Sequence, residues 1–226
     1  MALQTAKVPA AFEPLFAQAQ DYVREYFGQR QEDPTQGTIA IGGERYILMR
    51  AASMSVCFFE FIRNMYPALD TNEAIEAASR VLFDIAHNIG RADAKAFHRA
   101  TEVTDPIAKL STGPIHFAYT GWAFVDISDE SNPTPDDDFY LLYDHPRSFE
   151  ADSWISLEKK TSFCTCFMNA GYSSGWCEES FAVVLVSREI LCRARGDEHC
   201  RFIMAPPGRI EAHIEEYVKN HPELSG

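Results

Sequence analysis

Apolar residues recur at helical spacing near both ends of the chain. Residues 9–30 carry them at three- and four-residue intervals, and residues 208–220 carry a second stripe. Each stretch therefore predicts an amphipathic helix that packs against another surface. The first stripe consists of Phe12, Leu15, Phe16, Ala19, Tyr22, Val23 and Tyr26, and the second of Ile210, Ile214, Tyr217 and Val218.

Two further helices are expected between these ends. The stretch from Arg50 to about Tyr66 is rich in Met and Phe at helical spacing, and Pro67 ends it because proline does not continue a helix. Asp70 and Glu73 then have the spacing of a capping box. They predict the start of a longer helix that runs towards residue 100, with a break at the glycine of position 90.

Strand-like runs fill much of the remaining sequence. The run GTIAIGGERYILM predicts a hairpin around its paired glycines, and the alternating run from Ile115 to Ile127 predicts one strand. FYLLY predicts another strand, and the run FAVVLVSREILCRARGDEHCRFIM predicts two around a turn at 196–197. Residues 161–181 have a helical pattern interrupted at GYSSG. Because helices and strands mix without a regular βαβ alternation, we expect the α+β class.

Length and charge narrow the functional classes. With 226 residues the chain is long enough to bury a core without disulfide bonds. It carries 20 Lys and Arg against 33 Asp and Glu, a formal net charge of −13, and such a field repels phosphate backbones and anionic membranes. No apolar run is long enough to span a membrane, and the first residues lack the order of a secretory signal. We therefore expect a cytoplasmic protein that contacts neither nucleic acid nor membrane.

The cysteines are concentrated in one region. One of the six lies at position 57, and the other five lie between residues 164 and 200. This content is too sparse for a disulfide scaffold, and a reducing compartment keeps thiols free.

Four residues of this region suggest a metal site. Cys192 and Cys200 flank the predicted turn, Glu189 precedes Cys192 by three residues, and Cys166 lies on the predicted helix before them. Three thiolates and a carboxylate suit tetrahedral zinc. A site closed by four protein ligands has no open position for a water, so its expected role is structural.

The spacing alone leaves alternatives open. It matches neither Cys-x-x-Cys nor a standard zinc finger. In an arbitrary cytosolic chain, two cysteines eight residues apart are more often small buried core residues. Cys164 and Cys177 are rival third ligands, although on one helix Cys164 points away from Cys166.

Several motifs in this order resemble those of known domains. GYSSGW at 171–176, E-x-x-C at 189–192 and G-x-x-x-C-R-F at 196–202 resemble the signature of the 4-vinyl-reductase-type small-molecule-binding domain. Upstream, GTIAIGGERYILM, GRADA at 90–94, G-P at 113–114 and SFEAD at 148–152 resemble the sensor region of sigma-54-dependent activators of aromatic catabolism. The resemblance covers residues 35–205.

The resemblance implies a cytoplasmic homodimer that binds a small aromatic effector in a buried pocket and carries zinc on three cysteines and one glutamate. Carried over residue by residue, the zinc set falls on Cys166, Glu189, Cys192 and Cys200, each of the required type. The resemblance places a ligand-sensing domain at 35–205, whose zinc lobe spans about 145–205, and the apolar stripe before it marks residues 1–34 as a helical dimerisation segment. A linker helix at 206–226 would follow.

The implied pocket departs from the phenol sensors of that family. Where they have a histidine four residues after the glycine of Gly-Pro, this chain has Phe117, with His116 one position earlier. Where they have a tryptophan three residues before Ser-Phe-Glu, this chain has His145. Because Phe117 offers no hydrogen bond, we expect phenol to bind weakly and larger apolar aromatics to bind better, with His145 as the polar contact.

The residues assigned to the ligand pocket are mostly aromatic or apolar. Each of them also suits an ordinary core position, and the histidine also suits a loop. The assigned set is Leu110, Phe117, Trp122, Tyr143, His145, Phe149 and Trp176.

The function expected is a ligand-binding sensor in bacterial transcription or signal transduction, without catalysis of its own. GYSSG is not placed at a nucleophile elbow, no His/Asp order supports a hydrolase, and the chain has neither a dinucleotide fingerprint nor iron–sulfur spacing. The alternatives are a tetrapyrrole-handling protein related to vinyl reduction in bacteriochlorophyll biosynthesis and a zinc-stabilised scaffold without a ligand. The apolar stripes of the two terminal helices are surplus surface that favours a homodimer.

Overall fold

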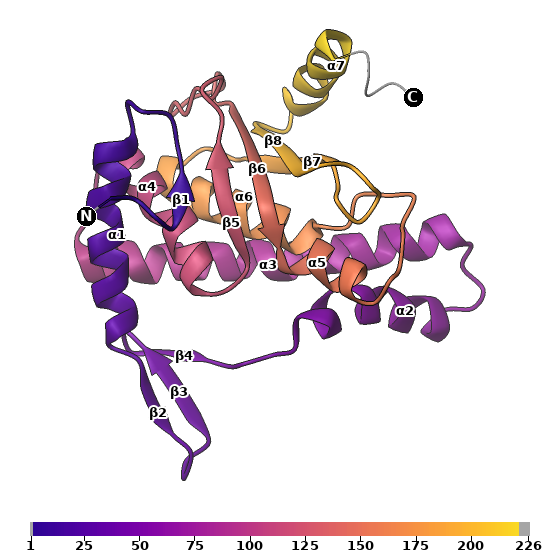
Figure 1. The fold of residues 1–226 in the computed structure, drawn as a ribbon, viewed down its shortest axis with the longest axis horizontal. Coiled ribbons are helices and arrows are strands. Elements are labelled where there is room, and N and C mark those ends of the chain that lie inside the picture. The colour runs from indigo at the N-terminus through magenta and orange to yellow at the C-terminus, as the bar shows by residue number, and fades with distance from the viewer. Residues whose placement is uncertain (1, 222–226) are drawn as a thin grey trace.

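The computed structural model describes residues 2–221 and is organised around a five-stranded sheet (Figure 1). The strand order is β1-β5-β6-β8-β7, with β1 parallel to β5 and every other neighbouring pair antiparallel. The strands are β1 (Ala6–Lys7), β5 (Ala123–Ile127), β6 (Leu141–Ser148), β7 (Val186–Leu191) and β8 (Cys200–Ala205). The expected mixture of helices and antiparallel strands is confirmed.

Helices cover both faces of this sheet. On one face lie α4 (Pro106–Tyr119) and α6 (Phe167–Phe181), and the long helix α3 (Thr71–Thr101) packs along α6. Helix α1 (Glu13–Gly28) packs on α4, while α2 (Val56–Met65), the 3₁₀ turn at Ala51–Met54 and α5 (Phe149–Ser156) pack together. Helix α7 (Ile210–Asn220) contacts β7 and β8.

Side-chain alternation in β8 assigns the two faces. Phe202 and Met204 join the main core beneath α4 and α6, whereas Ile203 joins a second cluster with Ile210 and Tyr217 of α7. Successive strand residues point to opposite faces of a sheet. Helix α7 therefore covers the face opposite to α4 and α6.

A second, three-stranded sheet projects from the end of α1 (Figure 1). Its antiparallel strands are β2 (Gln31–Asp33), β3 (Thr38–Ile41) and β4 (Glu44–Tyr46). Gly42 and Gly43 form the β3–β4 turn with φ of 58° and 85°, a region that favours glycine. The predicted hairpin is confirmed, but residues 47–49 continue as an irregular connection rather than as strand.

The capping box is confirmed, and the break predicted after it is wrong. The Asp70 side chain accepts from the Glu73 amide at 2.9 Å, and the Glu73 carboxylate accepts from the Asp70 amide at 2.9 Å. Helix α3 then runs without interruption through Gly90. A Cβ at this position would overlap the backbone carbonyl of Tyr172, so the glycine serves a close approach between α3 and α6.

The predicted strand from Ile115 to Ile127 is correct only in its second half. Its first half belongs to α4, which begins after the N-cap Asp105 and contains Pro114. Residues 110–117 are all buried, because α1, α6 and the sheet surround the helix. A helix buried on every side has no polar face, so its sequence lacks the 3.6-residue period that would have distinguished it from a strand.

The glycines of GYSSG do not interrupt their helix either. Helix α6 begins at Phe167, later than predicted, and passes through Gly171 and Gly175. A Cβ on Gly171 would overlap the carbonyl of Phe83, and one on Gly175 would overlap that of His87. Both glycines therefore let α6 lie backbone to backbone against α3.

The terminal apolar stripes are covered within the chain itself. In α1, Phe16, Val23 and Tyr26 belong to the main core, whereas Tyr22 is 43% exposed. The stripe of α7 packs on the sheet. These stripes therefore give less support to a dimer than the sequence suggested. Of the two segments expected at the ends of the chain, residue 1 and residues 222–226 lie outside the described part.

Candidate functional site

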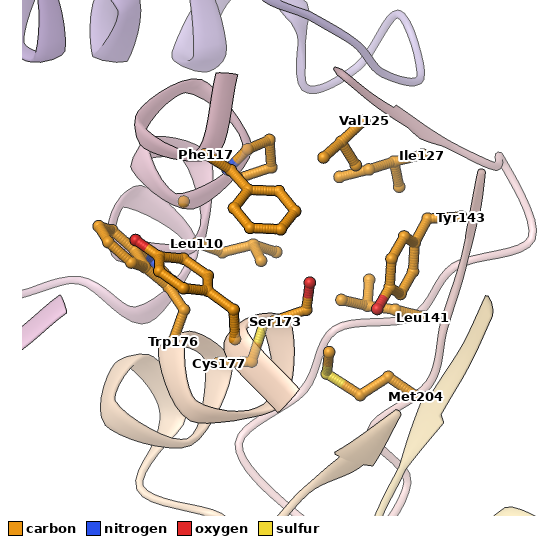
Figure 2. A pocket seen from close by; sticks show the side chains of 13 residues that line it. Leu110, Phe117, Val125, Ile127, Leu141, Tyr143, Ser173, Trp176, Cys177 and Met204 are labelled. Atoms are coloured by element: carbon orange, nitrogen blue, oxygen red, sulfur yellow. The ribbon is translucent and has the colours of Figure 1, made fainter. Parts of the chain in front are cut away.

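A cavity lies between α4 and α6 on one side and the sheet on the other (Figure 2). The volume of this cavity that the centre of a water molecule can occupy is about 40 Å³. One water needs about 10–15 Å³ on that scale, so the space suits one small ring better than a fused pair. Its walls are formed by Leu110, Gly113, Pro114, Phe117, Val125, Ile127, Leu141, Tyr143, Tyr172, Ser173, Trp176, Cys177 and Met204.

Local geometry places each wall. On β5, Val125 and Ile127 are two residues apart and share the inner face. On α6, the lining residues fall at positions 172, 173, 176 and 177, which form one face of a helix. On α4, Gly113 leaves room for the Trp176 indole, because a Cβ there would approach the indole to 2.7 Å.

Stacked aromatic rings form the α4–α6 side of the cavity. The rings of Phe117 and Tyr172 have centroids 4.7 Å apart and planes inclined by 25°, and Tyr172 stacks in turn on Trp176 at 6.1 Å. Stacked arrangements at such distances are favourable beyond simple burial. These contacts fix the orientation of the rings that a ligand would meet.

The polar groups of two of these rings bond away from the ligand space. The Tyr172 hydroxyl donates to Asp93 at 3.0 Å, and Nδ1 of His116 lies 3.0 Å from the same hydroxyl. The Trp176 indole donates to the carbonyl of Lys109 at 3.2 Å. Burial raises the pKa of the Asp93 carboxyl to about 6.

Four of the seven residues assigned to the pocket from sequence line the cavity, and three do not. The four are Leu110, Phe117, Tyr143 and Trp176. Trp122 packs behind the wall, with its ring centroid 4.9 Å from that of Tyr172. The ring centroids of Phe149 and Trp122 are 5.3 Å apart.

His145 is the third residue outside the lining set. Its ring is fully buried, with centroids 4.5 Å from Phe202 and 5.6 Å from Phe117. Neither ring nitrogen has a hydrogen-bond partner within residues 2–221. Burial lowers the pKa of His145 to about 3, so the imidazole is neutral.

Sequence reasoning missed several lining residues. Val125 and Ile127 were on the correctly predicted strand face, and this alternation was the available signal. Tyr172 and Ser173 lie in the GYSSGW motif, but the predicted helix interruption concealed the face that they share. Met204 lines the cavity only because β8 pairs with β6, and the local sequence around Met204 does not reveal that pairing.

The four candidate metal ligands converge at the other end of α6. The ligand atoms of Cys166, Glu189, Cys192 and Cys200 all lie within 4.8 Å of one another. Cys166 is the N-cap of α6, Glu189 lies on β7, and Cys200 begins β8. The strand pairing slips between Glu189 and Leu191, a bulge that re-aims the strand's side chains.

The donor geometry fits zinc. The sulfurs of Cys166 and Cys200 are 3.7 Å apart, and two sulfurs at about 2.3 Å from a tetrahedral zinc lie roughly 3.8 Å apart. One oxygen of Glu189 accepts from the Cys166 amide at 2.7 Å, while the other, Oε1, is buried without a hydrogen-bond partner in the described chain. That oxygen is the one available to a cation.

The surroundings hold these ligands in place. The Arg193 amide donates to the Cys200 sulfur at 3.4 Å, and the Ser148 hydroxyl lies 3.2 Å from the Cys166 sulfur. Burial raises the pKa of Cys166 and also that of Glu189. Without a cation, the low-dielectric site would therefore disfavour their charged, metal-binding forms.

The rival thiols lie outside this group of four. Cys177 lines the cavity instead, and Cys164 is only partly buried. Burial raises the pKa of Cys177 to about 12, so this thiol stays protonated.

Comparison with known proteins supports the resemblance that the sequence motifs indicated. Residues 30–131 match the sequence profile of a family described as an activator of aromatic catabolism. The resemblance to the sensor region of such activators is confirmed. No helix within residues 2–221 is both long enough and apolar enough to cross a membrane.

Two particular proteins are similar to this chain. The phenol regulator MopR of Acinetobacter guillouiae is 24% identical over 175 residues, which cover 77% of this chain and 30% of that protein. The chain thus spans less than a third of that regulator. The phenol-responsive sensory domain of the transcription activator PoxR, solved with phenol, matches with a TM-score of 0.72 at 20% identity. That match covers 89% of this chain and 98% of the solved domain, and it shows a shared fold.

Proposed function

We propose that this chain is a sensor domain that binds a small aromatic effector and controls the output of a transcription activator. The observation that carries the proposal is the apolar cavity walled by stacked rings, within a fold shared with a phenol-responsive domain. Its lining residues are apolar or bear hydroxyls, and the Cys177 thiol is protonated. Such a site binds a ligand rather than transforming it.

Single-ring aromatics are the proposed ligands. The sequence favoured larger rings, but the size of the cavity argues for one ring. We propose Leu110, Phe117, Tyr143 and Trp176 as direct contacts. Trp122 and Phe149 then act by supporting the wall, and His145 by closing the space behind Phe117. A tetrapyrrole, with four pyrrole rings, is far larger than this cavity, which argues against the tetrapyrrole alternative.

We propose zinc at the four-residue cluster, held by Cys166, Glu189, Cys192 and Cys200. Four protein ligands close the coordination sphere, so the metal would be structural. It would tie the start of α6 to the β7–β8 hairpin.

We propose a homodimer, now on a different surface from the terminal helices. Ile47, Leu48 and Met49 are 69%, 76% and 57% exposed, and Phe61 and Met65 lie one turn apart on the outside of α2. Adjacent exposed apolar residues of this kind are typical of protein interfaces. Light scattering should give twice the 25.5 kDa of one chain, and Leu48→Asp should lower that mass to one chain.

We propose that α7 is the linker helix to the output domain. Arg201 of β8 donates to Tyr217 of α7 at 2.5 Å and holds Asp144 of β6 through two bonds of 2.7 Å. The neighbour of Asp144 in β6 is Tyr143, which lines the cavity. This linkage supports a route from cavity to linker.

Calorimetry with phenol and naphthalene tests the ligand-binding proposal. Wild type should bind phenol more tightly than naphthalene. Leu110→Trp fills the cavity and should abolish binding, whereas Val184→Trp, at a position that is 68% exposed, should leave it unchanged. Thermal unfolding would show that both variants fold. Equal aromatic binding by Leu110→Trp and wild type, or none by wild type, would refute the proposal.

A further inference from the structure

The cavity contains a polar corner that the sequence did not indicate. Ser173 enters the cavity from α6, and Tyr143 enters from β6 on the opposite wall (Figure 2). Figure 2 shows both hydroxyl oxygens on the side of the cavity away from Phe117. The corner therefore lies apart from positions 117 and 145, at which the phenol sensors of the resembling family carry their polar pocket residues.

These hydroxyls lie in one corner of the cavity. The Tyr143 hydroxyl lies 2.7 Å from that of Ser187, and Ser173 projects into the same cavity beside Tyr143. Ser187 is fixed in turn, because its amide donates to the Ser174 hydroxyl at 2.9 Å. Burial raises the pKa of Tyr143 above its usual value, so its hydroxyl keeps its proton. Each hydroxyl has one donor and two acceptor sites, so three of them leave capacity for a further partner.

The Tyr172 hydroxyl and the Trp176 indole, two other polar groups of the walls, are engaged elsewhere. The Tyr172 hydroxyl bonds Asp93 and His116, and the Trp176 indole bonds a backbone carbonyl. Val125, Ile127 and the remaining wall side chains are mostly apolar. A ligand hydroxyl that entered this cavity would need a polar partner, because an unpaired buried hydroxyl is costly.

We propose that the hydroxyls of Ser173 and Tyr143, backed by Ser187, select a phenolic ring over a plain hydrocarbon ring of the same size. The inference rests on the proposed function and adds the orientation of the ligand: its ring lies against Phe117 and Tyr172, and its hydroxyl faces the Ser173–Tyr143 corner. Phenol is then a good ligand for this chain even though position 117 carries no hydrogen-bonding group.

The test compares phenol with toluene, which has a methyl group in place of the hydroxyl. Calorimetry on the folded chain gives the ratio of the toluene Kd to the phenol Kd for wild type, Ser173→Ala and Tyr143→Phe. Each substitution removes one oxygen atom. We expect wild type to prefer phenol and each variant to reduce that preference about tenfold, with toluene affinity changed less than about threefold.

Two further variants serve as controls. Tyr22→Phe removes a hydroxyl from the half-exposed face of α1 and should change neither affinity. His145→Phe removes the buried imidazole that the sequence suggested as the polar contact. We expect His145→Phe to leave the ratio of the toluene Kd to the phenol Kd unchanged.

The outcomes separate this inference from the proposed function. If wild type binds both ligands without preferring phenol, or if only His145→Phe lowers the preference, the inference is overturned while the sensor proposal stands. Equal loss of both ligands in Ser173→Ala and Tyr143→Phe would show a structural role for the hydroxyls and would also overturn it. Failure of wild type to bind either ligand would overturn both.

Discussion

Nδ1 of His116 lies 3.0 Å from the hydroxyl of Tyr172. Phe117, the next residue of α4, stacks on the ring of the same tyrosine, so Tyr172 is held at its edge and at its face. Burial lowers the pKa of His116 to about 3, which keeps the imidazole neutral. One wall of the cavity is thereby fixed before a ligand arrives, and pre-organisation of this kind lowers the entropic cost of binding.

The metal cluster predicts a protein that purifies with about one zinc per chain. Cys192→Ser and Cys200→Ser should each lose the metal and several kcal/mol of stability, because the unfolded chain does not preform the site. Elemental analysis and thermal unfolding would measure both effects. Cys57→Ser, at an exposed thiol, is the matched control and should retain metal and stability. Metal-free protein that unfolds cooperatively at wild-type temperature would refute the assignment.

The contact between α3 and α6 predicts strong sensitivity at two glycines. Gly171→Ala and Gly175→Ala each place a Cβ into a backbone carbonyl of α3, and we expect each to cost about 2–3 kcal/mol in unfolding free energy. Urea denaturation measures this cost. Gly28→Ala, where no atom lies within 4 Å of the added carbon, should be neutral or slightly stabilising. Wild-type stability of both α6 variants would contradict the close crossing.

The bonds of Arg201 predict how firmly α7 is attached. Its guanidinium pairs with Asp144 and donates to Tyr217, and side-chain exposures of 25% and 16% in the ion pair limit screening by solvent. We expect Arg201→Met to cost about 1–3 kcal/mol and to increase hydrogen exchange in α7. Arg188→Met breaks a far more exposed pair that also reaches α7, and it should cost less than about 0.5 kcal/mol. Equal effects of the two substitutions would argue against the clamp.

Asp93 predicts a pH-dependent contribution to stability. Burial raises the pKa of its carboxyl from 3.8 to about 6. The folded chain therefore retains a proton that the unfolded chain releases, so this contribution is fully present below pH 4 and is lost as the pH rises through 6. Asp93→Asn should exceed wild type in unfolding free energy by about 1–3 kcal/mol at pH 7, and the difference should vanish near pH 4.

Urea titrations between pH 4 and pH 7 measure that difference. Asp84→Asn, at an exposed carboxyl of the same helix, should show no comparable pH trend. A gap between Asp93→Asn and wild type that stays constant with pH would mean that Asp93 does not titrate as its burial implies.

Patterns with a visible period were predictable, and buried elements were not. The hairpin at Gly42, the capping box at Asp70 and the strands on either side of position 196 all follow from local sequence. Helix α4 was half misassigned because it is buried on every side, so its alternation resembled that of a strand. Gly90 and the glycines of α6 act through a neighbouring helix, and local propensity carries no information about that neighbour.

The two parts of the candidate site also differ in how well the sequence predicted them. The four candidate metal ligands were identified by residue type in a resembling motif, because thiolates and carboxylates are chemically distinctive, and the structure brings them together. The cavity was harder to predict, since Ser173 and Met204 gain their roles only when α6 and β8 face each other. His145 was expected to touch a ligand, and it lies behind the wall between Phe117 and Phe202.

Helix α6 starts at the candidate metal-ligand cluster, forms one wall of the cavity and lies backbone to backbone against α3 at Gly171 and Gly175. A helix seated in this way has a single stable position rather than a range of them. This wall cannot make room for a larger ligand unless α6 moves away from α3. Substitutions that widen the range of ligands should therefore lie in α4 and in the strands, because α6 is the wall of the cavity that does not move.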